Sequence, residues 1–422
     1  MVVLWLCNIS LPAASAKTKE KARVQGGWIQ SLLEQIISDA RIDRLIYLFP
    51  QKKEKNGVTG TDGKLQYIGF YSAERDPGTV PRGLTEVLRN ILLLRQPDLI
   101  HIMGTEYAHC VSMVDAAEKA GLLSRLAVSI QGMPSFCCRH YLTGIPAGIV
   151  KRKRLKDVIY SSSLIRQQRS MEQRGECEKY VLKKASYVIG RTEWDAACTA
   201  LIHPDRKYFH GSEILRGCFY EGAWNADCME RHSVFVSQAT YPVKGFHLFL
   251  EAAGLLIRKY RDLKIYAAGR DCYGGPSWKR SSYEKYVCDL IKKNGLEENV
   301  VFTGELSAEE MKKRYLRCHV FVSASTIENS PNSLGEAMIL GVPSVASDVG
   351  GVKDMLVHQK EGFLYPSDEP YMLAYYIDRI FADDGLAKRL GRAAQAHAGH
   401  THDREKAVKE LFGIYGHILK KQ

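Results

Sequence analysis

Two glutamates lie eight positions apart in the stretch S-T-I-E-N-S-P-N-S-L-G-E-A-M-I-L-G-V-P-S, residues 325–344. Glu328 precedes a short polar run, and Glu336 stands near the start of an apolar helical pattern. A carboxylate accepts hydrogen bonds from hydroxyl groups, and the amides at a helix start favour an anion such as a diphosphate. The spacing therefore suits a ligand that carries hydroxyl groups on both sides of a diphosphate.

The same stretch has a purely structural interpretation of about equal weight. Ser333-x-x-Glu336 has the form of a capping box, which satisfies helix-start amides without any ligand. Glu328 would then be a solvated loop acid. Under the ligand-binding interpretation, the amides of Ser333, Leu334 and Gly335 should be free to bind the diphosphate.

These residues must be positioned by a larger scaffold, and the chain alternates short apolar runs with longer helical patterns. Such alternation predicts βαβ units and parallel sheets, hence an α/β fold. In the first half the pattern predicts strands at 2–7, 44–49, 65–70, 99–103, 126–131 and 187–190, and helices at 28–38, 84–95 and 112–120.

A composition shift near residues 221–232 separates a second set of elements. We expect strands at 234–237, 263–268, 300–302, 320–324 and 342–346, and helices at 246–260, 283–294, 308–317, 334–340 and 402–419. The predicted domains are 1–225 and 226–400, with 401–422 as a terminal helix that returns to the first domain. Ligands of open α/β sheets bind at the carboxyl ends of the strands.

The charge of the chain indicates which kinds of partner it favours. The formal net charge of +12 favours anionic partners, and the sharpest basic run is Lys151–Lys156. That run is either a solvated segment or a membrane-surface contact.

Eleven scattered cysteines resemble neither a disulfide framework nor a zinc site, and they favour a reducing compartment. We interpret the apolar Val2–Cys7 as a buried strand rather than as part of a signal peptide, because no positive region precedes it.

The run from Glu328 to Gly351 resembles the E-x7-E signature of glycosyltransferase family 4, the retaining GT-B enzymes. The resemblance implies two Rossmann-like domains that face each other across a cleft. It also implies that Glu336 holds the ribose hydroxyls and that Glu328 holds the transferred sugar.

Further segments resemble this family. Tyr241–Gly245 resembles the loop whose lysine contacts the diphosphate, so Lys244 is the expected phosphate ligand, although a lone lysine is more often solvated. Gly26-Gly27 resembles the glycine-rich loop of the amino-terminal domain, or is a simple helix-start turn. With Glu336, the residues expected to bind the donor are Ser333, Leu334, Asn332, Gly27, Gln238, Gly269 and Leu306.

The acceptor side should include the loop that follows the strand at 99–103. His109 is the candidate catalytic residue there, in addition to Glu328 and Lys244 of the second domain, and Glu106 is an alternative base. Histidines at strand ends such as His101 and His109 are more often structural hydrogen-bonding groups. Arg191–Asp195 follows another strand end, where it either contacts the acceptor or caps a helix through Thr192.

Two positions depart from the family pattern. An arginine is usual a few residues before the Lys244 position, but Ser237-Gln238 occurs here, with Arg270 and Lys353 as weak substitutes. Gln131-Gly132 replaces a histidine–glycine pair, and glutamine cannot act as a general base.

The resemblance implies a metal-independent, retaining hexosyltransferase that uses a UDP- or GDP-sugar and no cofactor. The expected acceptor is a glycan or a lipid-linked glycan, in cell-surface polysaccharide or glycolipid synthesis. We expect a cytoplasmic protein with a peripheral contact at the inner face of the membrane, and no nucleic-acid partner. The alternatives are a GT-B-like nucleotide-sugar epimerase and, ranked lower, a basic nucleic-acid-binding protein.

Overall fold

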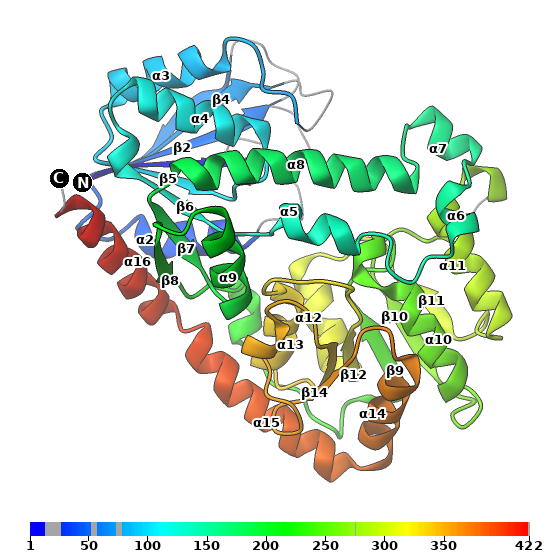
Figure 1. Ribbon diagram of the computed structural model, residues 1–422. Helices are drawn as coiled ribbons and strands as arrows, with labels where there is room; N and C mark the ends of the chain where they lie inside the picture. The colour runs from blue at the N-terminus through cyan, green and yellow to red at the C-terminus, as the bar shows by residue number, and fades with distance from the viewer. Residues whose placement is uncertain (13–26, 52–56, 73–77, 275, 421–422) are drawn as a thin grey trace. The chain divides into compact units, whose positions relative to one another are not determined.

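The computed structural model of the chain describes residues 1–12, 27–51, 57–72, 78–274 and 276–420. These residues form two compact units. The first comprises Met1–Cys138, Ser170–Ile214 and His402–Gln422, and the second comprises Arg139–Arg169 and Leu215–Thr401. The α/β prediction is confirmed, because each unit is a mainly parallel sheet with helices on both faces (Figure 1).

The first unit contains an eight-stranded sheet of order β3-β4-β2-β1-β5-β6-β7-β8. All neighbouring strands pair in parallel except β3 with β4. The strands are β1 (Val2–Cys7), β2 (Arg44–Gln51), β3 (Thr59–Asp62), β4 (Leu65–Tyr71), β5 (Leu99–Met103), β6 (Leu126–Ser129), β7 (Tyr187–Gly190) and β8 (Lys207–His210).

Alternate residues of β1 supply two different cores, because successive side chains of a strand point to opposite faces. Leu4 and Leu6 pack with α3 (Leu84–Arg95), α4 (Ala108–Lys119), α8 (Leu164–Lys184) and α9 (Glu193–Ile202). Val3 and Trp5 pack with α2 (Gly27–Ile36) and α16 (Arg404–Leu419), and α16 also lies against α2. The indole of Trp5 donates a 2.9 Å hydrogen bond to the Tyr415 hydroxyl. The terminal helix is therefore an integral part of the first unit.

The second unit contains a six-stranded parallel sheet of order β11-β10-β9-β12-β13-β14. Its strands are β9 (Glu230–Val236), β10 (Lys264–Ala267), β11 (Val300–Phe302), β12 (Cys318–Ser323), β13 (Ser344–Ser347) and β14 (Phe363–Tyr365). Its longer helices are α10 (Phe246–Leu256), α11 (Ser282–Lys293), α12 (Ala308–Arg317), α13 (Asn332–Ile339), α14 (Pro370–Ala382) and α15 (Asp384–Thr401).

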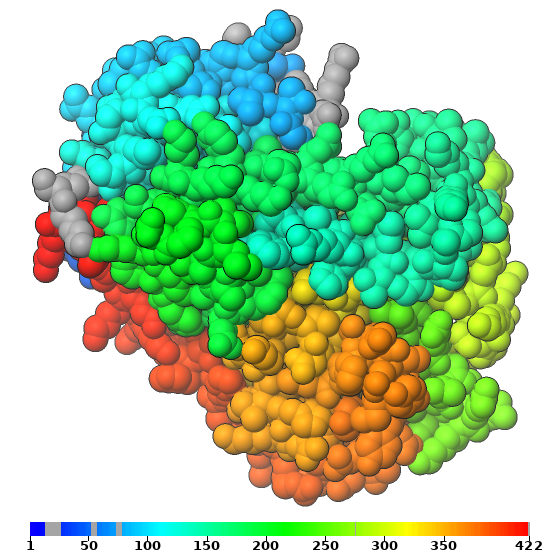
Figure 2. Space-filling view, viewed as in Figure 1, coloured from blue at the N-terminus to red at the C-terminus, as the bar shows by residue number. Residues whose placement is uncertain are grey.

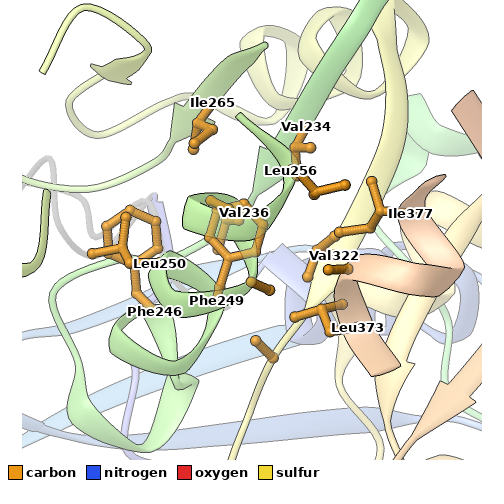
Figure 3. Packing of buried hydrophobic residues seen from close by; sticks show 14 of the residues in the cluster. Val234, Val236, Phe246, Phe249, Leu250, Leu256, Ile265, Val322, Leu373 and Ile377 are labelled. Atoms are coloured by element: carbon orange, nitrogen blue, oxygen red, sulfur yellow. The ribbon is translucent and has the colours of Figure 1, made fainter. Parts of the chain in front are cut away.

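Both faces of this sheet are buried. Figure 3 shows Val234, Val236 and Val322 packed against residues of α10 and α14 on one face. Phe235 and Phe321 alternate with them and pack against α12 and α13 on the other face. Apolar residues at consecutive strand positions are expected where helices cover a parallel sheet on both sides. This explains why these strands appear in the sequence as continuous apolar runs.

The unit boundaries differ from the predicted ones at two places. Residues 139–169 belong to the second unit, where the Thr143 carbonyl accepts from His247 at 2.9 Å and the His140 carbonyl accepts from Thr326 at 3.0 Å. Residues 215–225 also belong there, because Phe219 is fully buried in its core and the Trp224 indole donates to the Cys318 carbonyl at 2.7 Å. These partners are distant in sequence, so local composition could not indicate them.

All eleven cysteines are free thiols, in agreement with the prediction that they form no disulfide framework. In the described part of the chain, no helix combines the length and the apolar character needed to cross a bilayer.

Candidate functional site in the second unit

The sheet of the second unit reverses its strand order between β9 and β12. The chain leaves β9 toward β10 on one side, whereas it leaves β12 toward β13 on the other. At such a reversal the connections from the two strands lead to opposite sides of the sheet order, which leaves room for a ligand at the carboxyl ends of the strands. Lys244 follows β9 and Glu328 follows β12, so this position holds two of the three residues expected to be catalytic.

Lys244 and Glu328 form an ion pair, with the Lys244 ammonium on the Glu328 Oε1 atom. The Ser325 hydroxyl donates to the same oxygen at 2.8 Å. The two charged side chains remain partly accessible, at 27% and 14% exposed respectively. Each is therefore held in place and still within reach of a ligand.

Two glycines allow the loops to approach this ion pair. Gly245 has φ +67°, and a side chain there would collide with the Ala324 carbonyl oxygen. Gly350 has φ +54°, and a side chain there would collide with the Glu328 carbonyl oxygen. A left-handed φ and a close backbone contact both require glycine. The V-x-G and V-G-G patterns in the sequence thus bring the loops after β9, β12 and β13 together.

Glu336 lies on α13 and makes a bidentate ion pair with Arg216, with N–O distances of 2.7 and 2.8 Å. Glu336 is buried, at 3% exposed. Burial lowers the pKa of Arg216, but the bonds to Glu336 outweigh it and leave this pKa above its ordinary value. Arg216 was not among the predicted residues, and its separation of 120 positions from Glu336 gives no local signal.

At the start of α13, the structure contradicts both the prediction of ligand-binding amides and the alternative of a capping box. The amides of Leu334 and Gly335 donate to the Pro331 carbonyl at 2.9 and 3.3 Å, so the prediction that they are free is wrong. The capping-box alternative is also wrong, because the N-cap residue is Pro331 and makes no side-chain cap bond. Ser333 is the second residue of the helix, and the Glu336 carboxylate is directed to Arg216 instead.

Apart from Gly27, which lies in the first unit, the other residues expected to bind the donor occupy loops at the same edge of this sheet or the start of α13. Gln238 follows β9, and the Gly269 amide after β10 donates to the Gly304 carbonyl at 2.9 Å. Leu306 packs on the core, Asn332 begins α13, and Leu334 is wholly buried, so its side chain is a core residue. Of the weak substitutes for arginine, Arg270 is exposed after β10 and Lys353 is exposed in the turn that follows Gly351.

In the first unit, both histidines of the predicted acceptor side are buried. His109 lies in α4 at 2% exposed, with its ring stacked on Tyr107 and its edge on Phe70. His101 is equally buried; its Nδ1 meets the Tyr415 hydroxyl at 2.8 Å and its Nε2 meets Ser129 at 2.7 Å. Burial lowers the pKa of His101 to about 3, so it is a neutral structural histidine.

Other predicted positions of the first unit have local structural roles. Gly27 begins α2, and Gly26 lies outside the described residues. Thr192 caps α9 by accepting from the Asp195 amide at 3.1 Å, as in the helix-cap alternative. Gln131 and Arg191 line a cavity of about 50 Å³, which has room for water but not for a sugar.

Sequence reasoning missed Glu178, a fully buried carboxyl group on α8. It accepts from the Ser135 hydroxyl and amide and, at 3.4 Å, from the Thr105 hydroxyl. Burial, together with the neighbouring charge of Glu106, raises the pKa of Glu178 to about 8 against the opposing effect of the Ser135 and Thr105 hydrogen bonds. Burial also raises the pKa of Glu106.

Glu178 should make the stability of the protein depend on pH. Its folded pKa of about 8 exceeds the ordinary value of 4.5, so the folded state retains a proton that the unfolded state releases. Stability should therefore fall as the pH rises from about 5 to 8 and level off above that pH. Glu178→Gln should flatten this part of a melting-temperature profile, whereas Glu176→Gln, at an exposed position of the same helix, should not. Parallel profiles for wild type and Glu178→Gln would contradict the assignment.

Part of the second unit is similar in sequence to known proteins. Residues 224–397 match the family model for glycosyl transferases group 1. The matched residues make up less than half of the chain and include Lys244, Glu328 and Glu336. An uncharacterised glycosyltransferase of Methanocaldococcus jannaschii is 26% identical over 187 residues, which are 44% of this chain and 45% of that protein. The chain spans less than half the length of the curated relatives that it matches first.

Solved structures show the same architecture over the whole chain. Sucrose-phosphate synthase from Thermosynechococcus elongatus superposes with a TM-score of 0.75 at 16% identity and covers 100% of both chains. The Anabaena protein Alr3699/HepE, in complex with UDP and glucose, gives a TM-score of 0.67 at 16% identity, over 98% of this chain and 99% of that one. The fold is GT-B.

Proposed function

We propose that this protein is a retaining, metal-independent glycosyltransferase that moves a hexose from a nucleoside-diphosphate sugar to an acceptor hydroxyl. The observation that carries the proposal is the Lys244–Glu328 ion pair at the strand-order reversal of the second unit. The group 1 match over 224–397 supports it. A glycan or lipid-linked acceptor of cell-surface polysaccharide or glycolipid synthesis is the acceptor class we infer.

The ion pair explains how a site with two acids accepts an anionic donor. On binding, the Lys244 ammonium moves from Glu328 to the diphosphate, because a diphosphate carries more negative charge than one carboxylate. Glu328 is then free to accept hydrogen bonds from the hydroxyl groups of the transferred sugar. Glu336 keeps Arg216, and since each carboxylate oxygen has two lone pairs, it can also accept from ribose hydroxyl groups.

Transfer proceeds by attack on the face from which the diphosphate leaves. The bond between the anomeric carbon and the diphosphate oxygen breaks, and a bond from that carbon to the acceptor oxygen forms on the same face. The acceptor proton passes to the departing diphosphate, so no protein base is required. The residues of this chain stabilise the charge that develops on the diphosphate and orient the sugar.

A thermal-shift assay with UDP, GDP and ADP tests the donor site, and UDP comes first because the Anabaena neighbour holds it. A ligand present at about a hundred times its dissociation constant should add roughly 2.7 kcal/mol of stability. Glu336→Gln should lose this shift, measured against its own unliganded melting temperature. Glu309→Gln, at an exposed position of α12, should keep it. The absence of a shift with every nucleoside diphosphate would contradict the proposal. A product formed from the donor alone, without an acceptor, would assign an epimerase instead.

A further inference from the structure

The short helix α7 (Leu155–Ile159) in the second unit has its polar residues turned inward. Asp157 is 3% exposed and accepts from the Arg154 amide and the Ser282 amide, each at 3.0 Å, and from the Ser282 hydroxyl at 2.5 Å. Lys156 binds both carboxylate oxygens of Glu284 at 2.7 Å. The charged residues of α7 therefore anchor the helix to the rest of the unit.

The apolar residues of the same segment point into solvent. Val158, Ile159 and Tyr160 are 63%, 61% and 72% exposed, and Leu155 is also exposed. Trp278 lies in the adjoining turn, which contacts α7, and is 56% exposed. In a helix on the surface of a protein, apolar residues normally face the core, so this arrangement is inverted. Contiguous exposed apolar residues of this kind mark an interaction surface.

Basic residues surround these apolar side chains. Figure 2 shows the teal segment that contains α7 beside the yellow-green residues that follow β10. The Lys279 ammonium lies 5.1 Å from the centre of the Trp278 ring. Asp271, in the loop that follows β10, is an exposed acid. The exposed cations are Lys151, Arg152, Lys153, Arg270 and Lys279. A hollow of about 600 Å³ is lined by Leu155, Lys156, Ile159, Tyr160, Arg270, Trp278 and Lys279.

We propose that this basic-apolar surface, formed by residues 151–160, Arg270, Trp278 and Lys279, docks on an anionic lipid bilayer. Trp and Tyr side chains favour the boundary between headgroups and acyl chains, where one end of the ring is apolar and the other is hydrated. Lysine and arginine are attracted by anionic headgroups, and exposed apolar side chains insert between them. The surface supplies all three types of residue side by side.

The positive charge of this surface favours an anionic bilayer over a second copy of the chain as its partner. A symmetric dimer through this surface would place its five cations against the same five cations of the partner copy, and juxtaposed like charges oppose association. An anionic bilayer is complementary to them. The proposal uses residues remote in sequence from Lys244, Glu328 and Glu336, so it does not depend on the proposed function.

The test is co-sedimentation of the full chain with vesicles of phosphatidylcholine alone and with about a third phosphatidylglycerol. We expect binding to the anionic vesicles, weakened by salt, and little binding to the neutral ones. Since each basic residue near the surface contributes about fivefold, the triple substitution Lys151→Gln, Arg152→Gln and Lys153→Gln should weaken binding roughly a hundredfold. The pair Ile159→Ser and Trp278→Ala should weaken it as well.

Two control variants distinguish binding through this surface from binding through other exposed cations or other exposed apolar residues. Lys292→Gln with Lys293→Gln removes two exposed cations of α11, and Leu94→Ser with Leu201→Ser removes exposed apolar residues of the first unit. Both controls should bind anionic vesicles as the wild type does. The proposal is overturned by equal binding to neutral vesicles, by loss of binding in the controls, or by unchanged binding in the surface variants. It is also overturned if wild type self-associates and the Ile159→Ser, Trp278→Ala variant is monomeric, which would assign the surface to a second copy.

Discussion

Replacing Lys244 by alanine should lower kcat/KM for sugar transfer about a hundredfold to a thousandfold. This is the loss typical when one group that stabilises charge in the transition state is removed. Lys244 is the cation placed at the strand-order reversal, and its partner Glu328 would lose its positive neighbour at the same time. The measurement is steady-state transfer with the nucleotide sugar that the thermal-shift panel selects.

Two further variants sharpen that experiment. Lys244→Arg keeps the positive charge and should recover part of the activity, whereas Lys292→Ala, at an exposed position of α11, should leave it unchanged. If Lys244→Ala retained full kcat/KM with an intact thermal shift, Lys244 would be only the structural partner of Glu328. The proposed role of the ion pair would then be wrong, while the donor site at Glu336 would still stand.

The second large effect is on stability. Arg216→Ala should destabilise the second unit by about 3–5 kcal/mol, because it leaves the buried Glu336 carboxylate without its partner. The midpoint of urea denaturation, followed by a probe in the second unit, measures this loss. Arg216→Met combined with Glu336→Leu should recover most of it, because apolar side chains of similar volume carry no unpaired charge.

An exposed ion pair provides the matched comparison. Arg231 binds Asp384 at 2.5 Å, but the two side chains are 58% and 36% exposed. Arg231→Ala should therefore cost much less than Arg216→Ala, since water and salt screen both charges of an exposed pair. Equal losses for Arg216→Ala and Arg231→Ala would show that Glu336 is adequately solvated without Arg216.

Much of the fold could be predicted from local pattern. The expected bounds agree with α3 (Leu84–Arg95), β5 (Leu99–Met103) and α12 (Ala308–Arg317). The spacing of their apolar residues identifies these elements. Ser307 marks the start of α12, and Pro97 marks the end of α3. By contrast, α8 (Leu164–Lys184) was missed, because charged and polar residues dominate its sequence and only a thin apolar stripe contacts the core.

For the site, residue types and their spacing specify which chemical groups are available. The E-x7-E spacing and the Lys244-Gly245 pair place two carboxylates and one ammonium on segments that follow parallel strands, because alternating strands and helices require their connecting loops to meet at the sheet edges. What those groups bind in the folded chain was not predictable. Arg216, which neutralises Glu336, lies in a segment assigned to the other domain by composition.

The pairing of the charges and the burial of individual residues follow from the folded chain. It directed Glu336 to Arg216 rather than to the start of its own helix, buried His109 and Glu178, and turned the charged face of α7 inward. Such outcomes depend on contacts between residues far apart in sequence, and the energy of a charge depends on how much water the whole fold leaves around it. Local spacing specifies the groups, whereas burial and long-range pairing set their ionisation and their partners.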